Sequence, residues 1–251
     1  MRPYPADVKP FLLLGTRADD AVAENEYEAF LGFTGLAETD LRRHRLERVP
    51  LGPLDLDAWS GIFIGGGPFN SSDPAAEKSD TQLRVESDFE RLLDEVVARD
   101  FPLLGACYGI GTVGTHQGAV VDRTYGEPIG RVQVSLSEAG VDDPLFKAVP
   151  PVFEAFVGHK EAVRELPGHA ALLAGSPACP VQAFRVGRNV YATQFHPELD
   201  NHGLGLRIET YRYAGYFEPD EMDSLLEMAR ATVVVDPPKL LQRFVDLYAR
   251  P

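Results

Sequence analysis

Short, continuous apolar runs recur in the first hundred residues of the chain. Residues 11–14, 62–64 and 101–104 are runs of this kind, each with the length of a strand that is buried on both faces. Glycine comes directly after each of these three runs and interrupts the pattern there. A fourth strand is expected at residues 45–49, where leucine and valine stand among charged residues. This half of the chain therefore contains four predicted strands.

Amphipathic stretches separate these runs. Residues 27–34 carry apolar side chains at helical spacing before Gly35 ends the pattern. Ser79 stands three residues before Gln82, which is typical of the first turn of a helix. A single apolar stripe follows, formed by Val85, Phe89, Leu92, Leu93, Val96 and Val97. The alternation of strand and helix predicts an open, mostly parallel twisted sheet with helices on both faces, a three-layer α/β fold of the flavodoxin-like kind.

The second half of the chain has a different pattern. Apolar and polar residues alternate over 131–136, as in a strand with one exposed face. Residues 181–186 and 190–195 are two further predicted strands, joined by a turn that contains glycine and asparagine, and so form a small β-hairpin region. After Gly203 the pattern is helical again, with amphipathic stretches at 219–229 and 240–248. The chain contains no internal repeat.

Charge and length exclude several classes of function. The 251 residues include 24 Lys and Arg against 38 Asp and Glu, a net charge of −14. This acid excess argues against binding to nucleic acid or to an anionic membrane, since phosphate groups need a cationic surface. The chain begins without the apolar stretch of a secretory signal and has no apolar run of membrane-spanning length. We therefore expect a cytoplasmic protein, and the charge does not indicate which small molecule or protein it binds.

The chain has two cysteines, Cys107 and Cys179. Two are too few for a disulfide framework or for a cysteine-based zinc site, and we expect neither a metal nor a cofactor. In a reducing compartment a lone cysteine is either a small core residue or a nucleophile. We expect Cys179, which stands between alanine and proline, to be inert.

Cys107 stands at the end of a predicted strand, in the sequence Gly105-Ala106-Cys107-Tyr108-Gly109. Small residues on both sides permit a sharp turn from strand to helix, the geometry that exposes a nucleophile and directs backbone N–H groups at an oxyanion. A helix that begins just after the cysteine also favours the thiolate. The glycine-rich segment 65–67 follows another strand, and the carboxyl ends of parallel strands meet at one edge of a sheet. Taken alone, the segment around Cys107 fits a structural turn equally well.

A thiolate nucleophile needs a base and a group that orients the base. The sequence Phe195-His196-Pro197-Glu198 supplies both at the end of a predicted strand. A carboxylate two residues from an imidazole can bind one ring nitrogen and fix the tautomer. The chain has six histidines, so one of them beside an acid is no surprise in itself. The combination with Cys107 and the glycine-rich strand end favours a catalytic role.

Three motifs together resemble a known family. The segments Gly66-Gly67-Pro68, 105–109 and 195–198 are similar to those of class I glutamine amidotransferases, above all the amidotransferase part of GMP synthetases and its free-standing relatives. Their order agrees, with 89 positions from Cys107 to His196. The resemblance covers residues 10–200 and implies an amidotransferase-like domain there. Residues 203–251 would then be a C-terminal helical extension packed on or next to it.

The resemblance implies a role for each matching residue. Cys107 would attack the γ-carboxamide of glutamine and form a γ-glutamyl thioester. His196 would take the thiol proton and deliver it to the departing ammonia, with Glu198 orienting the ring. The backbone N–H groups of Gly67 and Tyr108 would form the oxyanion hole.

The substrate pocket departs from the family pattern at two places. Gly111 stands four residues after the nucleophile, where the family usually has a glutamine that holds the α-amino and α-carboxylate end of the substrate. The relatives have Ser-His-Gly-Asp where this chain has residues 158–161. His159 therefore matches their histidine, and Glu161 stands in place of their aspartate. The resemblance implies that Gly66, Gly111 and His159 contribute to substrate binding.

Three functions remain open at this stage. The first is hydrolysis of glutamine by a Cys-His-Glu triad, with the ammonia passed to a separate synthetase subunit, because the residues beyond 200 are too few for an acceptor domain. The second is a free-standing γ-glutamyl hydrolase or peptidase, which Gly111 favours because it alters the pocket. The third is a catalytically weak relative that acts as a binding or regulatory module. Retention of Cys107, His196 and Glu198 argues against the third.

Overall fold

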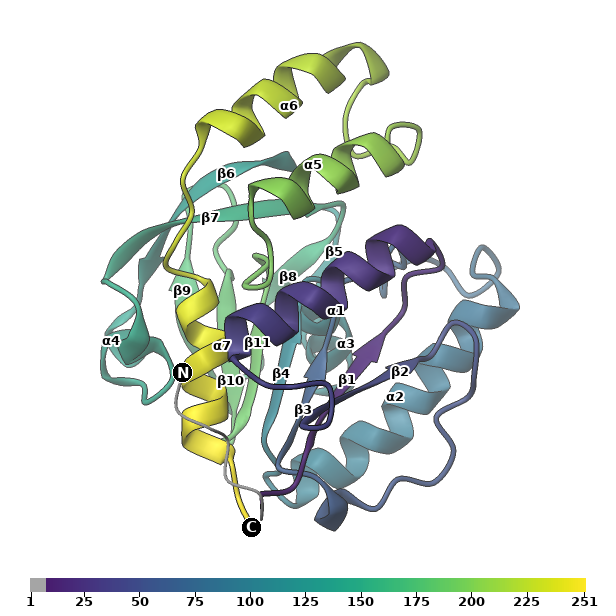
Figure 1. Ribbon diagram of the computed structural model, residues 1–251, viewed down its shortest axis with the longest axis vertical. Helices are drawn as coiled ribbons and strands as arrows, with labels where there is room; N and C mark the ends of the chain where they lie inside the picture. Colours follow the sequence, from purple (N-terminus) through teal and green to yellow (C-terminus); the bar gives the residue numbers. More distant parts are fainter. Residues whose placement is uncertain (1–7) are drawn as a thin grey trace.

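A nine-stranded sheet forms the centre of the computed structural model, which describes residues 8–251 (Figure 1). Its strands follow the order β2-β1-β3-β4-β11-β10-β9-β6-β7, and β5 and β8 pair separately. The strands are β1 (Phe11–Gly15), β2 (Leu41–Arg45), β3 (Gly61–Ile64), β4 (Leu103–Ala106), β5 (Val120–Asp122), β6 (Glu127–Leu136), β7 (Val152–His159), β8 (Ala162–Glu165), β9 (Ala170–Gly175), β10 (Ala183–Val186) and β11 (Val190–Thr193).

The sheet has a parallel half and an antiparallel half. Strands β2, β1, β3, β4 and β11 are parallel, and they include the three apolar runs of the first hundred residues. From β11 onward, β10, β9, β6 and β7 pair antiparallel. The predicted hairpin is present as β10 and β11, with Gly187 at φ 57° in its turn. It belongs to a larger antiparallel extension, because β9, β6 and β7 continue the same sheet.

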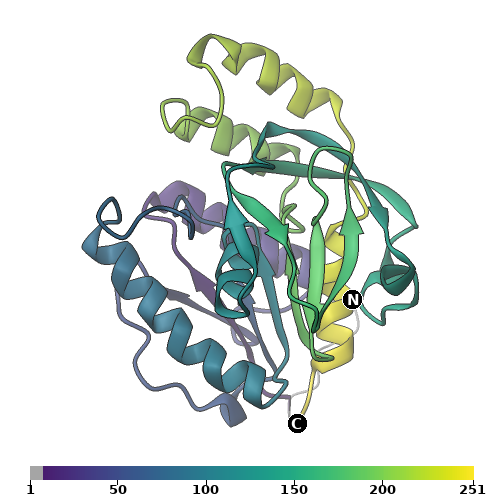
Figure 2. The ribbon, with the colours of Figure 1, turned by 180° about the vertical axis from the view of Figure 1, so that it is seen from behind.

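Helices cover both faces of the parallel half, which confirms the predicted fold class. Helices α1 and α7 lie on one face, in front of the strands in Figure 1. Helices α2 and α3 lie on the other face, in blue to teal in the view from behind (Figure 2). The helices are α1 (Asp20–Thr34), α2 (Asp80–Ala98), α3 (Tyr108–His116), α4 (Glu138–Asp142), α5 (Asn201–Thr210), α6 (Met222–Ala231) and α7 (Pro238–Tyr248), with short 3₁₀ turns at η1 (Leu56–Ala58), η2 (Phe146–Ala148) and η3 (Pro219–Glu221).

Side chains of each central strand alternate between two cores. Along β1, Phe11 and Leu13 enter the core under α1 and α7, whereas Leu12 and Leu14 enter the core under α2 and α3. All four side chains are at most 4% exposed. A strand buried on both faces needs a continuous apolar run, which explains why these strands were recognisable in the sequence.

Local signals in the sequence place the ends of two helices correctly. The Ser79 hydroxyl accepts a hydrogen bond from the Gln82 N–H at 3.2 Å and caps α2. Gly35 ends α1 at φ 72°, a left-handed conformation that favours glycine. Both caps confirm the sequence interpretation.

The predicted strand at 45–49 is wrong. The edge strand β2 ends at Arg45, and the N–H groups of Arg48 and Val49 both bond to the Arg45 carbonyl in a turn. Strand β2 has only Leu41 fully buried, so its sequence is polar and lacks an apolar run. Leu46 is buried at the turn, and Val49 is 54% exposed. The two apolar residues of the turn therefore gave a pattern that resembles a strand. The edge strand itself is mostly polar and gave no hydrophobic pattern.

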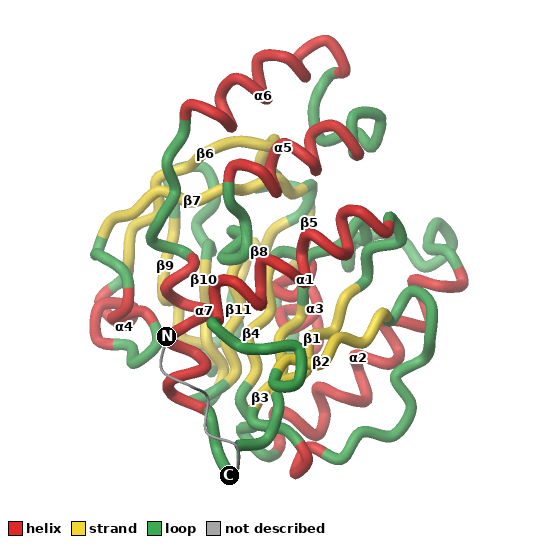
Figure 3. The backbone as a smooth tube through the Cα atoms, viewed as in Figure 1, coloured by secondary structure: helices red, strands yellow, loops and turns green. Residues whose placement is uncertain are grey.

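Four loops meet at one edge of the sheet because β1, β3, β4 and β11 are parallel neighbours. They begin after Gly15, Ile64, Ala106 and Thr193. Helices α5 and α6 pack on one another and on β6 and β7, beyond this edge (Figure 3). No helix within the described residues is both long and apolar enough to cross a membrane.

Candidate active site

Cys107 lies at the turn between β4 and α3, with φ 52° and ψ −95°. A positive φ at a residue other than glycine costs about 1–3 kcal/mol and persists only where the surroundings fix it. Here the Cys107 N–H donates to the Thr193 carbonyl at 2.8 Å, and a Cβ on Gly105 would lie 3.1 Å from the Gly109 backbone. The small residues that flank the cysteine are therefore needed for the turn. Helix α3 begins at Tyr108, so its N-terminus lies next to the thiol.

His196 and Glu198 follow β11 and lie beside Cys107. The His196 Nδ1 lies 2.7 Å from Glu198 Oε1, and His196 and Cys107 line the same cavity. Because Nδ1 faces Glu198, Nε2 is the nitrogen left for the thiol. His196 is 5% exposed and Glu198 1% exposed, so both depend on one another for their charge.

Electrostatics favour the charged form of this pair. Burial opposes protonation of His196, but the charges of Glu198 and Cys107 outweigh it and raise the pKa of His196 to about 9. Burial likewise favours the neutral acid at Glu198, but the His196 charge outweighs it and lowers the pKa of Glu198 to about 2. At neutral pH the pair therefore consists of an imidazolium and a carboxylate, and the imidazolium lines the same cavity as Cys107.

The glycine-rich loop after β3 packs closely against the triad. A Cβ on Gly66 would lie 2.7 Å from His196 Cε1, and a Cβ on Gly67 would lie 2.1 Å from Thr16 Oγ1. Only glycine therefore fits at both positions. Gly67 lines the cavity at Cys107. The Tyr108 N–H belongs to the first turn of α3, where backbone N–H groups have no partner within the helix.

The cavity beside Cys107 has a volume of about 30 Å³, which is room for about one water molecule. A segment after α5, residues 211–217 (the closing segment), lines it through Tyr211 and Tyr216. Arg17 Nη1 donates to the Tyr211 hydroxyl at 3.1 Å. The Lys160 ammonium donates to a carbonyl of the segment and lies 4.7 Å from the Tyr216 ring centre. Two cations therefore hold the closing segment over the nucleophile.

Further residues of this cavity were not singled out from the sequence. They come from β6, β7, α5 and the segments after β1, β11 and α5: Arg17, Ile129, Val157, Gly158, Leu199, Leu204, Arg207, Tyr211 and Tyr216. Arg17 had a usable signal, because it closely follows β1 and so lies at the same edge as Cys107. The others had none, since their approach depends on how α5 and the closing segment fold back over the sheet.

Gly111 and Glu161 form one structural unit. A Cβ on Gly111 would lie 2.8 Å from Glu161 Oε1 and 3.0 Å from Ser71 Oγ. The Glu161 carboxylate accepts hydrogen bonds of 2.7 Å from the N–H groups of Ser71 and Ser72. Glu161 thus occupies the space that a larger side chain at position 111 would need, and it anchors the loop that follows Gly67. The two departures from the family pattern are coupled.

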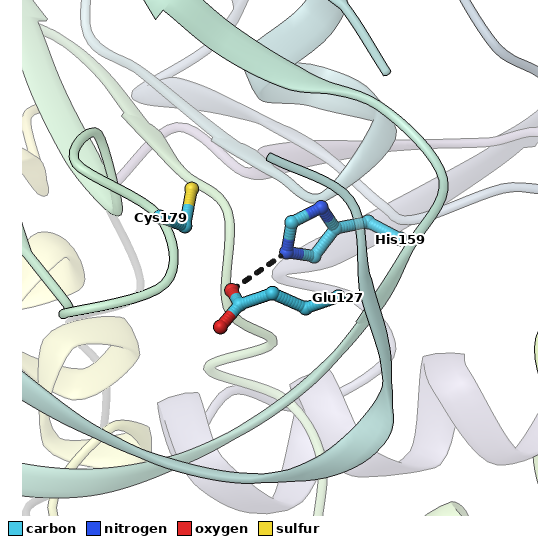
Figure 4. Close-up of side chains that lie close together, drawn as sticks. All are labelled: Glu127, His159 and Cys179. Carbon is cyan, nitrogen blue, oxygen red and sulfur yellow. Dashed lines mark hydrogen bonds and ion pairs between the residues drawn. The ribbon is translucent and has the colours of Figure 1, made fainter. Parts of the chain in front are cut away.

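His159 lies outside the cavity at Cys107, in a second buried cluster with Glu127 and Cys179 (Figure 4). Its Nε2 lies 3.0 Å from Glu127 Oε2, and its Nδ1 lies 2.8 Å from the Glu161 carbonyl. Neither nitrogen is free for a substrate, so the structure gives no support for a contact of this ring with one.

The cluster of Glu127, His159 and Cys179 has the residue types of a metal site, with ligand atoms within 4.8 Å of one another. Its atoms are already engaged, however. Gln182 Nε2 donates to Glu127 Oε2 at 2.7 Å, and the Cys179 thiol donates to the Val181 carbonyl at 3.5 Å. Burial and the nearby Glu127 charge raise the pKa of the thiol to about 12, which disfavours the thiolate that a metal ion requires. The geometry is that of a hydrogen-bonded core cluster.

Comparisons with known proteins agree with this arrangement. The family model "Glutamine amidotransferase class-I" matches residues 40–209. One subunit of the glutamine-hydrolyzing GMP synthase of Thermoplasma acidophilum is 28% identical over 155 residues, which cover 61% of this chain and 70% of the relative. The glutamine-hydrolyzing GMP synthase of Lactobacillus delbrueckii subsp. bulgaricus is 30% identical over 149 residues, 59% of this chain but 26% of that longer protein.

A solved structure has the same fold. The crystal structure of a glutamine amidotransferase from Thermotoga maritima superimposes with a TM-score of 0.73 at 19% identity, and covers 95% of this chain and 97% of that one. The family match spans Cys107, His196 and Glu198. The chain therefore belongs to the class I glutamine amidotransferase family.

Proposed function

We propose that the protein hydrolyses the γ-amide of glutamine through a γ-glutamyl thioester on Cys107. The observation that carries the proposal is the His196–Glu198 hydrogen bond at the cavity of Cys107, which itself stands at a strained turn between strand and helix. Nucleophile, base and orienting acid stand in the order that triad chemistry requires. Family membership supports the same reaction class.

The steps follow from the charges of the triad. The Cys107 thiolate attacks the γ-carbonyl carbon, and the carbonyl π electrons move to its oxygen. His196, protonated at neutral pH, gives its proton to the amide nitrogen as the C–N bond breaks, so that ammonia leaves and a thioester remains. Water then loses a proton to His196 and attacks the thioester, which releases glutamate and restores the thiolate. Glu198 orients the ring and stabilises its charged form.

The oxyanion of each tetrahedral intermediate needs hydrogen-bond donors. The N–H of Gly67 and the N–H of Tyr108 are the proposed pair, since Gly67 lines the cavity and Tyr108 opens α3. Loss of one such donor typically costs about 2.7–4 kcal/mol of transition-state stabilisation. The cavity has room for about one water molecule, so the segment 211–217 must move before a substrate enters.

The ammonia would serve a synthetase on a separate chain. We propose that residues 10–200 form the amidotransferase domain and that residues 203–251 are an extension that packs on it. The similarity to a relative that is itself named as one subunit of a GMP synthase supports a partner chain. Because a thiol nucleophile needs a reducing compartment, we also propose a cytoplasmic location.

One observation favours a second candidate, a free-standing γ-glutamyl hydrolase or peptidase. The family glutamine is replaced by Gly111, and Glu161 fills the adjoining space. The pocket therefore departs from the family pattern at the end that holds the α-amino and α-carboxylate groups, and a γ-glutamyl compound other than glutamine is the second candidate substrate. The same thioester would form, and the difference lies only in the group that departs.

Labelling with the glutamine analogue 6-diazo-5-oxo-norleucine tests the shared chemistry. Intact mass is measured for the wild type, for Cys107→Ala and for Cys179→Ala as the matched control. One adduct on the wild type and on Cys179→Ala, with none on Cys107→Ala, is the expected result. A folded wild-type protein that takes up no adduct would overturn the proposal.

Product release then separates the two candidates. Glutamate and ammonia are measured after incubation with glutamine, and glutamate alone after incubation with γ-glutamyl dipeptides. Faster release from glutamine favours the amidotransferase. Faster release from the dipeptides favours the γ-glutamyl hydrolase.

A further inference from the structure

Arg207 is a buried cation in the wall of the cavity at Cys107. It lies on α5, is 4% exposed, and lines the same cavity as Cys107 and His196. A guanidinium cannot lose its charge at neutral pH, so its burial must be compensated by hydrogen bonds or by an anion. The hydrogen bonds of its guanidinium nitrogens show how far this burial is compensated.

Only one side of the guanidinium is satisfied. Nη1 donates to Asn25 Oδ1 at 2.8 Å and to the Gly203 carbonyl at 2.9 Å. Nε and Nη2 are buried and have no hydrogen-bond partner among residues 8–251. These two nitrogens form the edge of a guanidinium that binds a carboxylate through two parallel hydrogen bonds. The unpaired edge is thus the one suited to a carboxylate ligand.

The buried carboxylates nearby are paired with other groups. Glu26 forms an ion pair of 2.8 Å with Arg17. Glu198 bonds to His196 at 2.7 Å through Oε1, and its Oε2 has no hydrogen-bond partner among residues 8–251. Within the described part of the chain, no carboxylate oxygen lies within 4.0 Å of an Arg207 nitrogen. Burial and then the Arg17 charge lower the pKa of Arg207 to about 10, which leaves it charged at neutral pH. The cavity wall therefore presents a cation without a close counter-ion.

We propose that Arg207 binds the α-carboxylate of the γ-glutamyl substrate through its Nε and Nη2 N–H groups. This inference rests on the proposed function and names the group that replaces the missing family glutamine. At Gly111 the adjoining space holds the Glu161 carboxylate, an anion that repels a substrate carboxylate. The substrate's negative end must therefore lie against a different wall, and Arg207 provides a cationic one. Arg207 is then a determinant of specificity for substrates that carry an acid group.

A purely positioning role predicts a different behaviour. The Arg207 charge also helps to lower the pKa of Glu198, so its removal could weaken the triad without any contact to substrate. A positioning residue affects substrates with and without the α-carboxylate equally. A residue that binds the carboxylate affects only those that have it. The ratio of the affinities for two ligands, one with and one without the α-carboxylate, therefore distinguishes the two roles.

The test is a binding measurement by calorimetry on the Cys107→Ala protein, which has no nucleophile. The two probes are L-glutamine and L-glutaminamide, in which a neutral amide replaces the α-carboxylate. They are compared in the parent, Arg207→Met and Arg207→Lys backgrounds. Arg185→Met is the matched control, because it removes the same charge from β10, where Arg185 pairs with Asp143 at 3.0 Å.

We expect the parent to bind glutamine about 10- to 100-fold more tightly than glutaminamide, the range of a charge-assisted hydrogen-bonded pair. Arg207→Met should bring this ratio to about one, Arg207→Lys should leave an intermediate ratio, and Arg185→Met should leave it unchanged. Equal affinities in the parent would overturn the inference while glutamine hydrolysis by the wild type kept the proposed function intact. A ratio that survives in folded Arg207→Met would overturn it as well. Binding of neither probe, together with no glutamine hydrolysis, would remove the proposed function and the inference with it.

Discussion

Two clusters of this protein contain the same three residue types, and they differ in burial, in hydrogen bonding and in the presence of a cavity. Cys107, His196 and Glu198 meet at the carboxyl edge of the parallel strands, next to a cavity. Cys179, His159 and Glu127 meet inside the antiparallel half of the sheet (Figure 4). The second set shows what a cysteine, a histidine and a glutamate do when they serve the core.

The difference lies in the histidine. In the first cluster one ring nitrogen of His196 binds Glu198, and the other is left for the thiol. In the second, both nitrogens of His159 are taken by Glu127 and by a backbone carbonyl. The Cys179 thiol is completely buried, and its pKa is raised to about 12, so it stays protonated. We therefore expect reactivity to depend on a free ring nitrogen and on a strained, accessible turn rather than on residue type.

Glu161 connects the two regions. Its carbonyl accepts from His159, while its carboxylate accepts from the N–H groups of Ser71 and Ser72 in the loop beside the active cavity. The core cluster therefore fixes the backbone of Glu161, whose carboxylate holds the loop that follows Gly67. This gives His159 a structural role at a distance from the cavity.

Replacement of each cysteine by alanine should give the largest difference in activity between the two clusters. Cys107→Ala is expected to lower kcat for glutamine hydrolysis by a factor of about 10⁴ or more, because the nucleophile is lost. Cys179→Ala should keep kcat within about twofold and cost about 1 kcal/mol of unfolding free energy for the small cavity that it leaves. Steady-state kinetics and chemical denaturation measure both quantities. A Cys107→Ala protein with full activity would refute the assignment of the nucleophile.

Replacement of each glutamate by glutamine should distinguish the two clusters through the pH dependence of kcat/KM. In the folded protein the pKa of His196 is raised from 6.5 to about 9, and Glu198 is the leading cause of the increase. The stability that the charged His196 contributes beside Glu198 is therefore complete below about pH 6.5 and is lost as the pH rises through 9. Glu198→Gln should move the alkaline limb of kcat/KM to lower pH and reduce kcat about 10²- to 10⁴-fold.

Glu127→Gln is the matched change in the other cluster. It should leave the alkaline limb in place and lower the free energy of unfolding by about 1–3 kcal/mol, since it disturbs buried hydrogen bonds to His159 and Gln182. An alkaline limb that responds to Glu127→Gln and ignores Glu198→Gln would reverse the comparison.

Gly111→Ala tests the segment that links the two regions. The new Cβ would lie 2.8 Å from Glu161 Oε1, so we expect a loss of about 1–3 kcal/mol in the free energy of unfolding. Gly32→Ala is the control, because Gly32 is also helical and a Cβ there would meet no atom of another segment within 4 Å. It should stabilise the protein by about 0.5–1 kcal/mol. Equal effects in chemical denaturation would show that Glu161 does not fill the space beside position 111.

Removal of the Lys160 cation, which contacts the segment 211–217, should give the smallest effect. Lys160→Met deletes the cation above Tyr216 and should raise the rate of Cys107 alkylation by iodoacetamide about two- to fivefold. Cys179 should remain unreactive in both proteins. Lys147→Met, which removes an exposed lysine from η2, is the control for charge. No change in the rate would mean that Lys160 does not hold the segment closed.

Local signals made much of this molecule predictable from its sequence. The cap at Ser79 and the turn at Cys107 depend on a few neighbouring residues, and both were recognised. The edge strand β2 was misplaced because an edge strand that is mostly polar carries no hydrophobic signal, whereas the turn after it contains Leu46 and Val49. The antiparallel extension was only partly predicted, since its half-exposed strands alternate weakly.

Contacts between distant segments could not be predicted. Arg207 looks like an ordinary surface residue of an amphipathic helix, and its burial at the cavity depends on how α5 packs. Gly111 and Glu161 were recognised as two separate departures from the family pattern. Their coupling is visible only when α3 and the loop after β7 are placed side by side. Residue types thus indicated the chemistry of the site, whereas the shape of its pocket depends on the packing.

Trapping of the covalent intermediate is the decisive experiment for the role of Cys107. The wild-type protein is mixed with glutamine, quenched in acid within the first turnover, digested, and mapped by mass spectrometry. We expect one γ-glutamyl group on the peptide that contains Cys107, and none on the peptide that contains Cys179. A γ-glutamyl group on Cys179, or continued hydrolysis of glutamine with Cys107 unmodified and replaceable by alanine, would contradict the proposed mechanism.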